Sequence, residues 1–589
     1  MPSAADPLPR RVGATPAPAA PAGHGRILGL RRRRLLLRIA VVGLLAAMAA
    51  GMVTAAAEQT PTIDEPVYVG TAVVYVQQHS LRYNPEHPPL GKLIMAAGLA
   101  FAEPRLDPAF TGTQGDVGRH LLYESGNDPW RLMLLARLPI IVLTLLFGLV
   151  VFAFARDLVG PVGGLVALAL YAFSPDLVAH GSLATLDVPA AGFLLTAAWL
   201  LWRARVRPVR YLPLAAVALG AAVATRMSAL AALPVLLLLT VLSVWSARAT
   251  GDARPSDGAA DPRPDDTGAA VSRQPGRRAT MRSLALGAAA AVAVALVAVA
   301  VVWASYLAVD PRLRWAAPAN VPTVGGLRGL AVGLLPFPAP FRDGMRVQFG
   351  FEDSAFGGFL FGRHYVGSLW YYLPAALLVK TPLGMLALWL AGAGALLTRP
   401  RLRPVAPYLL LPAGVLLAAA MTGSRDFGVR YAIVVPMFLA VAAAGVLAAP
   451  RRWAPVLTAA LVLFVAVSSA RSYPYYLPYA NEAFGGPAKT HLRLHDSNVD
   501  WGQDLGRLAD RLARRYPGER VWLVYKGSGV PSYYGIDAAD PLKVPQGEVR
   551  GLLVVSNSSA AKATERLAAL LDTSTAIDQV GHSITIYRR

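Results

Sequence analysis

Long apolar segments alternate with short basic connectors along most of the chain. Eleven of these segments are predicted to form membrane-spanning helices, because most approach the roughly 20 residues that a helix needs to cross a bilayer. Their expected limits are 35–56, 131–155, 161–180, 186–202, 211–226, 228–247, 283–305, 369–398, 405–422, 431–449 and 453–470. The predicted fold class is an α-helical polytopic membrane protein with about 11 transmembrane helices. The segment 211–247 also fits one long helix interrupted at "TRMSA".

Arginine clusters between the apolar segments predict the orientation of the chain. Threading the eleven helices in turn places every strong cluster on one side, among them "RRRR" at 31–34, "RARVRPVR" at 203–210 and "TRPRLRP" at 398–404. Such clusters mark the cytoplasmic side. The stretch 248–282 falls on the same side and is predicted to be a flexible linker. We therefore expect an integral, multi-pass plasma-membrane protein with a cytoplasmic N-terminus and an external C-terminus.

The threading divides the chain into three parts. Residues 1–34 are predicted to be a disordered, basic N-terminal segment in the cytoplasm, because they begin with a Pro- and Ala-rich stretch and end in arginines. Residues 35–470 form the transmembrane domain, with external loops at about 57–130 and 306–368. Residues 471–589 form an external C-terminal domain.

The C-terminal domain shows mixed polar and apolar patterns of soluble type. "LGRLADRLARRY" has the period of an amphipathic helix, and "AAKATERLAALL" supplies another helix. "RVWLVYKG", "GLLVVSN" and "SITIYRR" are typical of strands. These elements predict a small α/β domain outside the membrane.

Composition supports the membrane assignment and explains the positive net charge without a nucleic-acid partner. Of the 589 residues, 55% are hydrophobic and only 15% are charged, which is well below the charged share of soluble domains. The net charge of +21 comes mainly from arginines at the ends of apolar segments, so no nucleic-acid partner is expected. The chain has no cysteine, and no disulfide can hold its external parts.

Three acidic residues are candidates for chemistry near the outer surface. Asp64 and Glu65 follow the first predicted span and precede an aromatic, apolar stretch. A carboxylate in such a partly buried place can act as a general base. Asp187 begins a predicted span, where a carboxylate is costly and points to function. The alternatives are a solvated edge for the pair and a helix-terminus acid for Asp187.

The stretch "NPEHPPLGK" places Glu86 and His87 before two prolines. Proline fixes the backbone and prevents a regular helix, so this loop is predicted to be stiff. Such a loop could hold His87 toward an anion, with Glu86 as a carboxylate partner or metal ligand. The alternative is a turn at the membrane surface that only starts the next helix.

Cationic residues also gather near the predicted outer surface. Lys380 lies inside a predicted span and Arg430 begins one, while Arg363 lies in an external segment. A cation at membrane depth must reach the interface, pair with an acid or bind an anion. These residues predict a cationic cavity suited to a phosphate.

The ordered set of these motifs resembles a known family. External "DE" at Asp64 and Glu65, then "NPEHPPLGK", "LDVP", "WYYLPAALLVKTPLG", "GVRYAIVVP" and "LHDSNVDWGQDL" resemble lipid-carrier-dependent glycosyltransferases of the protein O-mannosyltransferase type. The family is glycosyltransferase family 39-like, with the C-type (GT-C) architecture, and is related to aminoarabinose transferases. The resemblance covers residues from about 60 to 535. This chain has Tyr68 in "DEPVY", where many bacterial members have histidine.

The resemblance implies both a reaction and the residues that perform it. A sugar would pass from a polyprenyl-phosphate donor to an acceptor hydroxyl on the outer face, with inversion, in the domain spanning 35–470. Asp64 would be the general base, with Glu65 beside it and Asp187 in support. His87, Lys380 and Arg430 would bind the donor phosphate, supported by Glu86 and Arg363. No nucleotide is expected, because the donor is already activated and no "GxxxxGK[ST]" loop is present.

Several alternatives stay open at the level of sequence. A lipid-sugar or small-molecule transporter, or flippase, is the rival function, because Asp187 and Lys380 could line a pathway. The acceptor could be a protein, a polysaccharide or a lipid, and a divalent metal at the site is neither required nor excluded. In "DSNVDWGQDL", residues Asp496 to Gln503 could bind a sugar or simply cap the following helix.

Overall fold

The computed structural model describes residues 24–251, 277–318 and 321–589. The chain divides into two compact units, Met1–Gly43 and Leu44–Arg589, and the sections below concern the second unit except where helix α1 (His24–Glu58) is named. This helix begins before the expected limit at residue 35. Most of the predicted disordered segment 1–34 and of the predicted linker 248–282 lies outside the described residues.

Within the described residues, six helical stretches are long and apolar enough to cross a membrane. They are Arg31–Glu58 in α1, α5 (Pro129–Ala172), α8 (Pro208–Thr225), Met227–Ala249, Thr280–Leu307 in α10 and Arg403–Met421. Met227–Ala249 joins a 3₁₀ turn to most of α9, and Arg403–Met421 joins a 3₁₀ turn to α15. A seventh is added if the bent pair α13 (Tyr372–Lys380) and α14 (Leu383–Thr398) counts as one span. The chain is thus a multi-pass membrane protein, and the predicted count of eleven spans is not confirmed.

Backbone breaks and short helices account for the difference in count. Helix α5 contains most of the two predicted spans 131–155 and 161–180, and its backbone leaves the helical conformation at Val159 and Gly160. Helix α7 (Asp187–Ala204) carries an acid in its first turn and a base in its last, which lower its hydropathy. The predicted spans 431–449 and 453–470 correspond to short apolar helices, α16 (Val434–Ala443) and α17 (Ala454–Ala470).

Two predicted spans have sharp interruptions. The prediction of one continuous helix over 369–398 is wrong, because α13 and α14 meet at an angle of 118°. Pro382 begins the second helix there, and a proline cannot continue the preceding one. The suspected break at "TRMSA" is confirmed, since Arg226 has extended backbone angles and a 3₁₀ turn, Met227–Ala232, follows it.

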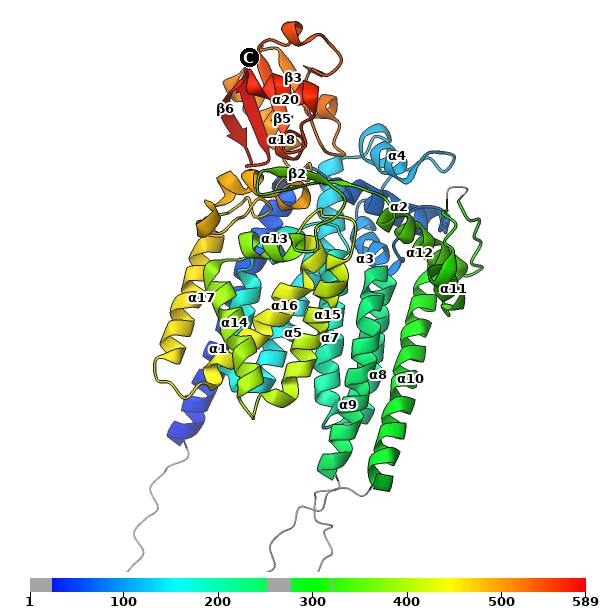
Figure 1. The fold of residues 1–589 in the computed structure, drawn as a ribbon, viewed down its shortest axis with the longest axis vertical. Coiled ribbons are helices and arrows are strands. Elements are labelled where there is room, and N and C mark those ends of the chain that lie inside the picture. Colours follow the sequence, from blue (N-terminus) through cyan, green and yellow to red (C-terminus); the bar gives the residue numbers. More distant parts are fainter. Residues whose placement is uncertain (1–23, 252–276, 319–320) are drawn as a thin grey trace, which may run out of the picture. The chain divides into compact units, whose positions relative to one another are not determined.

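The helices pack through apolar and small residues. Helix α7 packs on α8, and α10 (Arg277–Leu307) packs on both α8 and α9 (Leu233–Gly251), as Figure 1 shows. A Cβ at Gly220 on α8 would lie 2.6 Å from the Cβ of Val301 on α10, so only glycine permits this approach. On the other side, α16 packs on α5, α14 and α15 (Ala406–Met421).

Shorter elements cover one end of the helices. The segment after α1 forms α2 (Glu65–Gln78), α3 (Leu90–Leu99) and α4 (Gln114–Arg119), and α6 (Pro175–Gly181) lies between α5 and α7. The segment before α13 forms α11 (Gly326–Leu334), α12 (Ala339–Glu352) and an antiparallel hairpin, β1 (Gly357–Leu360) with β2 (Arg363–Val366).

The C-terminal segment folds around a five-stranded sheet of order β4-β3-β5-β7-β6. Central strand β5 (Leu552–Ser556) is fully buried, and it runs parallel to β3 (Val521–Val524) and antiparallel to β7 (Ile584–Arg588). These are the three predicted strands, and α18 (Leu505–Arg515) and α20 (Glu565–Asp572) match the predicted helices. The sequence pattern missed the short β4 (Ala538–Ala539), β6 (Thr575–Val580) and α19 (Asn557–Ala560).

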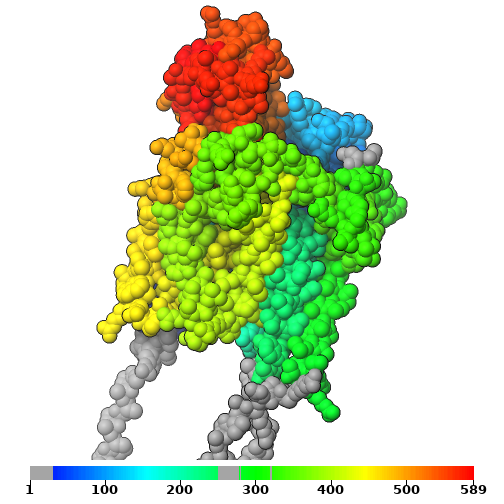
Figure 2. All heavy atoms as spheres, in the orientation of Figure 1, coloured from blue at the N-terminus to red at the C-terminus, as the bar shows by residue number. Residues whose placement is uncertain are grey.

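The sheet domain makes specific contacts with the helical part. Ser497 Oγ donates a hydrogen bond to the Phe427 carbonyl at 2.5 Å, and the Phe361 amide donates to the Arg493 carbonyl at 2.8 Å. In Figure 2 the orange and red atoms of this domain adjoin the green atoms of the segment that precedes α13. The domain therefore packs directly against the end of the helices where the short elements gather (Figure 1).

Candidate functional site

A cavity of about 860 Å³ lies where the short elements, the helix ends and the sheet domain meet. Its polar wall includes titratable side chains from segments far apart in the sequence: Asp64, Glu86, His87, Asp187, Arg226, Arg328, Glu352, Arg425, Arg430, Asp496, Lys526 and Lys562. Its apolar wall comes from α7, α15 and α16, with Leu194, Leu416, Ala419, Ala420, Ile433 and Val434. Such a large concave site with convergent polar groups is the usual form of a ligand-binding site.

Asp64 and Arg430 form an ion pair on the wall of this cavity. Asp64 occupies the N-cap position of α2, but its carboxylate makes no capping bond and instead accepts from Arg430 Nη1 at 2.6 Å. The Arg430 guanidinium lies 4.3 Å from the ring centroid of Trp501. Its Nε finds no hydrogen-bond partner among the described residues. The pair thus joins a partly exposed carboxylate to a cation that still has a free donor.

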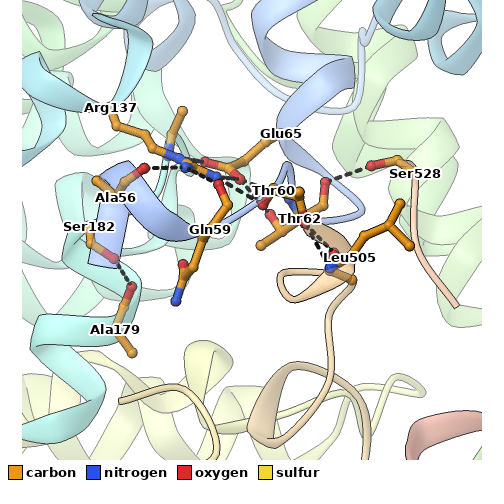
Figure 3. A network of polar contacts seen from close by, with 12 residues as sticks. Ala56, Gln59, Thr60, Thr62, Glu65, Arg137, Ala179, Ser182, Leu505 and Ser528 are labelled. Atoms are coloured by element: carbon orange, nitrogen blue, oxygen red, sulfur yellow. Dashed lines mark hydrogen bonds and ion pairs between the residues drawn. The ribbon is translucent and has the colours of Figure 1, made fainter. Parts of the chain in front are cut away.

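Glu65 points away from the cavity, although it follows Asp64 directly. Its carboxylate pairs with Arg137 Nη2 at 2.6 Å (Figure 3), and both side chains are fully buried. Burial alone would raise the pKa of Glu65, but the charge and hydrogen bonds of Arg137, with the amides of Thr62 and Ala184, lower it. The structure gives Glu65 a role in holding the turn that carries Asp64.

Arg137 completes this network from α5. Its guanidinium also donates to the backbone carbonyls of Ala56, Gln59 and Thr60, which end α1 and begin the turn (Figure 3). Thr60 Oγ1 in turn donates to the Gly502 carbonyl at 3.1 Å. One buried cation therefore links the turn before Asp64 to α5, and Thr60 links it to the loop that carries Trp501.

The proline loop wraps around a buried lysine. Lys92 Nζ donates to the Asn84 carbonyl, the Asn84 side chain and the His87 carbonyl, at 2.7–3.0 Å. Glu86 accepts from Gln114 Nε2 at 2.7 Å, and its side chain lines the cavity. The lysine that ends "NPEHPPLGK" is therefore an internal support, which sequence reasoning did not assign.

His87 lines the cavity as a neutral ring. Burial, with the positive charges of Arg226 and Lys92, holds the pKa of His87 well below its usual range. Its ring meets the Tyr68 ring edge to face at 5.6 Å, and its Nδ1 has no partner among the described residues. In this state His87 can offer a hydrogen bond to a ligand but no positive charge.

Asp187 also lies on the cavity wall, at the first residue of α7. It forms an ion pair with Arg226 at the break before the 3₁₀ turn. The Arg226 guanidinium lies 5.3 Å from the Tyr431 ring centroid. Because the helix breaks at Arg226, this side chain reaches the cavity.

Two predicted phosphate-site residues lie apart from the cavity lining. Lys380 is fully buried at the end of α13, where Nζ lies 3.3 Å from Asp176 and donates to the carbonyls of Leu477 and Asn498. Arg363 is exposed on β2. Asn498 Oδ1 then accepts from the Val429 amide, one residue before Arg430, so Lys380 reaches the site only through other residues.

The C-terminal domain closes the cavity with four side chains: Asp496, Trp501, Lys526 and Lys562. Asp496 has a φ of +56°, which is uncommon for a residue other than glycine and often marks functional loops. The other polar residues of "DSNVDWGQDL" are buried and hold the loop; Asp500, for example, accepts from the amides of Gly502 and Ser558. Sequence reasoning singled out Asp496 and Trp501 but missed the two lysines, which have no local pattern to distinguish them.

Comparison with protein families finds a match for the N-terminal part of this architecture. Residues 41–304 match the model of the family described as dolichyl-phosphate-mannose-protein mannosyltransferase (PMT). They form a PMT-family domain. This confirms the resemblance derived from the sequence motifs. Asp64, Glu86, His87, Asp187 and Arg226 lie inside the PMT-family domain, so it supplies one wall of the cavity.

Comparison with solved structures finds similarity over longer parts of the chain. ArnT from Cupriavidus metallidurans bound to undecaprenyl phosphate is 15% identical, with 93% of this chain and 97% of that chain covered and a TM-score of 0.45. The Archaeoglobus fulgidus oligosaccharyltransferase AglB, in complex with an inhibitory peptide and a dolichol-phosphate, is 13% identical, with coverages of 81% and 58% and a TM-score of 0.40. The S. cerevisiae Pmt1–Pmt2 complex bound to the sugar donor is 19% identical, with coverages of 47% and 33% and a TM-score of 0.34. At these TM-scores the likeness identifies no shared site.

No curated protein sequence matches this chain significantly. The PMT-family domain and the candidate spans make the chain a multi-pass membrane protein of glycosyltransferase type. Within the described residues, no group of three or more His, Cys, Asp or Glu side chains is placed to hold a metal ion.

Proposed function

We propose that the chain transfers a sugar from a polyprenyl-phosphate donor to an acceptor hydroxyl, with Asp64 as the general base. The observation that carries this proposal is the partly exposed Asp64 carboxylate, which lies on the wall of a large cavity and is paired with Arg430 at 2.6 Å. One cavity then holds a base for the acceptor hydroxyl and a cation that can stabilise a leaving phosphate, the two groups that this displacement uses.

The reaction would proceed in a single displacement. Asp64 accepts the proton of the acceptor hydroxyl, whose oxygen forms a bond to the anomeric carbon of the sugar. The bond between that carbon and the phosphate oxygen breaks, and its electron pair leaves with the lipid phosphate. Attack from the face opposite the leaving group inverts the configuration of the anomeric carbon.

Stabilisation of the leaving phosphate would fall to the cavity cations. Arg430 is bound to Asp64 on one side and keeps its Nε without a partner among the described residues, so it can donate to a phosphate. Arg226 and the His87 ring line the same cavity and add a charge and a hydrogen-bond donor. Lys380 was expected among these ligands, but its ion pair with Asp176 and its hydrogen bonds to two carbonyls favour a positioning role.

The apolar wall suits a lipid-linked donor. Leu194, Leu416 and Val434 belong to helices of the membrane region and meet the polar wall within one cavity. A polyprenyl chain can contact such residues while its phosphate reaches the cations. We place this site on the external face of the membrane, in line with the arginine distribution. The acceptor is a protein, a polysaccharide or a lipid.

Turnover of donors in vesicles tests this function. The purified chain is reconstituted in liposomes with polyprenyl-phosphate sugars of several kinds, and mass spectrometry follows the release of polyprenyl phosphate and the glycosylated acceptor. Asp64→Asn should lower transfer by about 10²–10⁴-fold, the usual contribution of a general base. Asp107→Asn, an exposed acid of the same external segment, is the matched control and should leave transfer unchanged.

Two outcomes would contradict the proposal. Near-normal transfer by Asp64→Asn would exclude Asp64 as the base. Movement of labelled lipid-sugar across the vesicle membrane, with no transfer product from any donor, would support the rival transporter function.

A further inference from the structure

Two lysines of the C-terminal domain reach the cavity. Lys526 follows β3 and Lys562 follows α19, and both line the cavity with Asp496 and Trp501. All four residues lie outside residues 41–304, which match the PMT family. The C-terminal domain thus adds a basic wall of its own to the cavity.

Lys562 differs from the other cations of the lining. Each of the others has a carboxylate partner: Arg226 with Asp187, Arg328 with Asp353, Arg425 with Glu352, Arg430 with Asp64 and Lys526 with Asp496. Across the described part of the chain, Lys562 forms no ion pair. Its Nζ lies 5.5 Å from the centroid of the Phe427 ring, a cation–π contact.

The surroundings of Lys562 favour a bound anion. Burial, and the positive charge of Lys526, lower the pKa of Lys562 to about 8, against the opposing effect of Asp496. A partly buried ammonium without a counter-ion is unfavourable, and an anion between the two lysines would offset that cost. Lys92 and Lys380, which are fully buried, differ from Lys562, because their ammonium groups donate hydrogen bonds to carbonyl oxygens.

The position of the lysines points to the acceptor as the source of this anion. They belong to the sheet domain, in which no candidate membrane span lies among the described residues. The lipid chain of the proposed donor would contact the apolar wall built by α7, α15 and α16, whereas the two lysines line the cavity from the sheet domain. Asp496 pairs with Lys526 and also interacts electrostatically with Arg430, which connects this basic wall to the Asp64 pair.

We propose that Lys526 and Lys562 form a subsite for a carboxylate or phosphate group of the acceptor, close to the hydroxyl that receives the sugar. This proposal rests on the proposed function, because it assigns the group to the acceptor of that reaction. It predicts that acidic acceptors, such as an acidic polysaccharide or a phosphate-bearing glycan, are preferred over neutral ones.

Binding measurements on the full-length protein in lipid nanodiscs test the subsite. Glucuronate and glycerol phosphate serve as the carboxylate and phosphate probes, and both are titrated after saturation with polyprenyl phosphate. The wild type should bind at least one probe, and Lys562→Gln should weaken that binding at least tenfold. Lys543→Gln changes an exposed lysine of the same domain and should alter probe affinity by less than twofold.

The variants also distinguish an acceptor subsite from a donor-phosphate site. Polyprenyl phosphate affinity should change by less than threefold in Lys562→Gln and in Lys526→Gln/Lys562→Gln. Lys562→Arg keeps the charge and should retain probe binding, which guards against a loss caused by misfolding. A tenfold loss of polyprenyl phosphate affinity in Lys562→Gln would overturn the proposal in favour of a donor-phosphate site. Failure of the wild type to bind either probe would also overturn it.

This experiment is independent of catalysis. Probe binding needs no turnover, so an inactive wild type or an active Asp64→Asn variant would contradict the proposed function and leave the subsite measurable. Conversely, active transfer without probe binding would contradict only the subsite.

Discussion

Arg430 Nη1 donates to Asp64 Oδ2 at 2.6 Å, although the two residues lie 366 positions apart in the chain. The same guanidinium packs on the ring of Trp501, a residue of the C-terminal segment. One arginine on the cavity wall therefore contacts both the PMT-family domain and the C-terminal domain. The guanidinium group is both charged and planar, and these two contacts use both properties.

Arg430→Lys should impair transfer even though it conserves the positive charge. A lysine cannot bond Asp64, stack on Trp501 and offer a further donor at the same time. Because a hydrogen bond between charged groups is worth about 1.5–3 kcal/mol, we expect kcat/KM for the donor to fall about 10- to 100-fold. Steady-state kinetics in liposomes would measure this. Arg363→Lys, at the exposed residue of β2, should behave like wild type, and an equal loss there would argue against a special role for Arg430.

Glu65→Gln should destabilise the fold rather than act on the chemistry alone. It leaves the fully buried Arg137 without its carboxylate partner, and breaking a buried pair in this way costs about 3–5 kcal/mol. Thermal unfolding of the purified protein would show a lower midpoint. Glu124→Gln, at an exposed pair with Arg119, should leave the midpoint unchanged, as surface pairs contribute little.

Lys380→Met separates a positioning role from a phosphate-binding role. Loss of the ammonium leaves Asp176 without its partner and frees the carbonyls of Leu477 and Asn498, so unfolding should occur at lower temperature. Adding Asp176→Asn should recover part of the loss, with a coupling of about 0.5–3 kcal/mol in a double-mutant cycle. A raised KM for the donor with unchanged stability would instead support direct phosphate binding by Lys380.

The affinity for the glucuronate probe should fall as the pH rises through about 8. Lys562 has its pKa lowered to about 8, so it is mostly charged at pH 7 and mostly neutral at pH 9. If binding needs this charge, the affinity should drop about tenfold between pH 7 and pH 9, because the charged fraction of Lys562 drops about tenfold over the same range. Lys526 and Asp496 are the charged groups that act on Lys562, and Lys526 pairs with Asp496. Lys562→Arg should make the profile flat, and a slope that persists in that variant would assign the titration to another group.

The sequence by itself determined the membrane class, most helices and the main strands of the C-terminal domain. Apolar length and period are local properties, and they set helices and strands without reference to distant residues. The motif at Asp64 and the loop at Glu86 and His87 were identified for the same reason, because acids and prolines are conspicuous within an apolar chain.

Only the tertiary structure decided how those residues are used. Asp64 and Glu65 are neighbours in sequence, yet one faces the cavity and the other pairs with Arg137 inside the protein, since successive helical residues point in different directions. Lys380 appeared to be a phosphate ligand because its buried acceptors, Asp176 and the Asn498 carbonyl, are distant in sequence. Lys526 and Lys562 look like ordinary surface lysines until folding places them beside the cavity, because a side chain's partners depend on packing rather than on its neighbours in the chain.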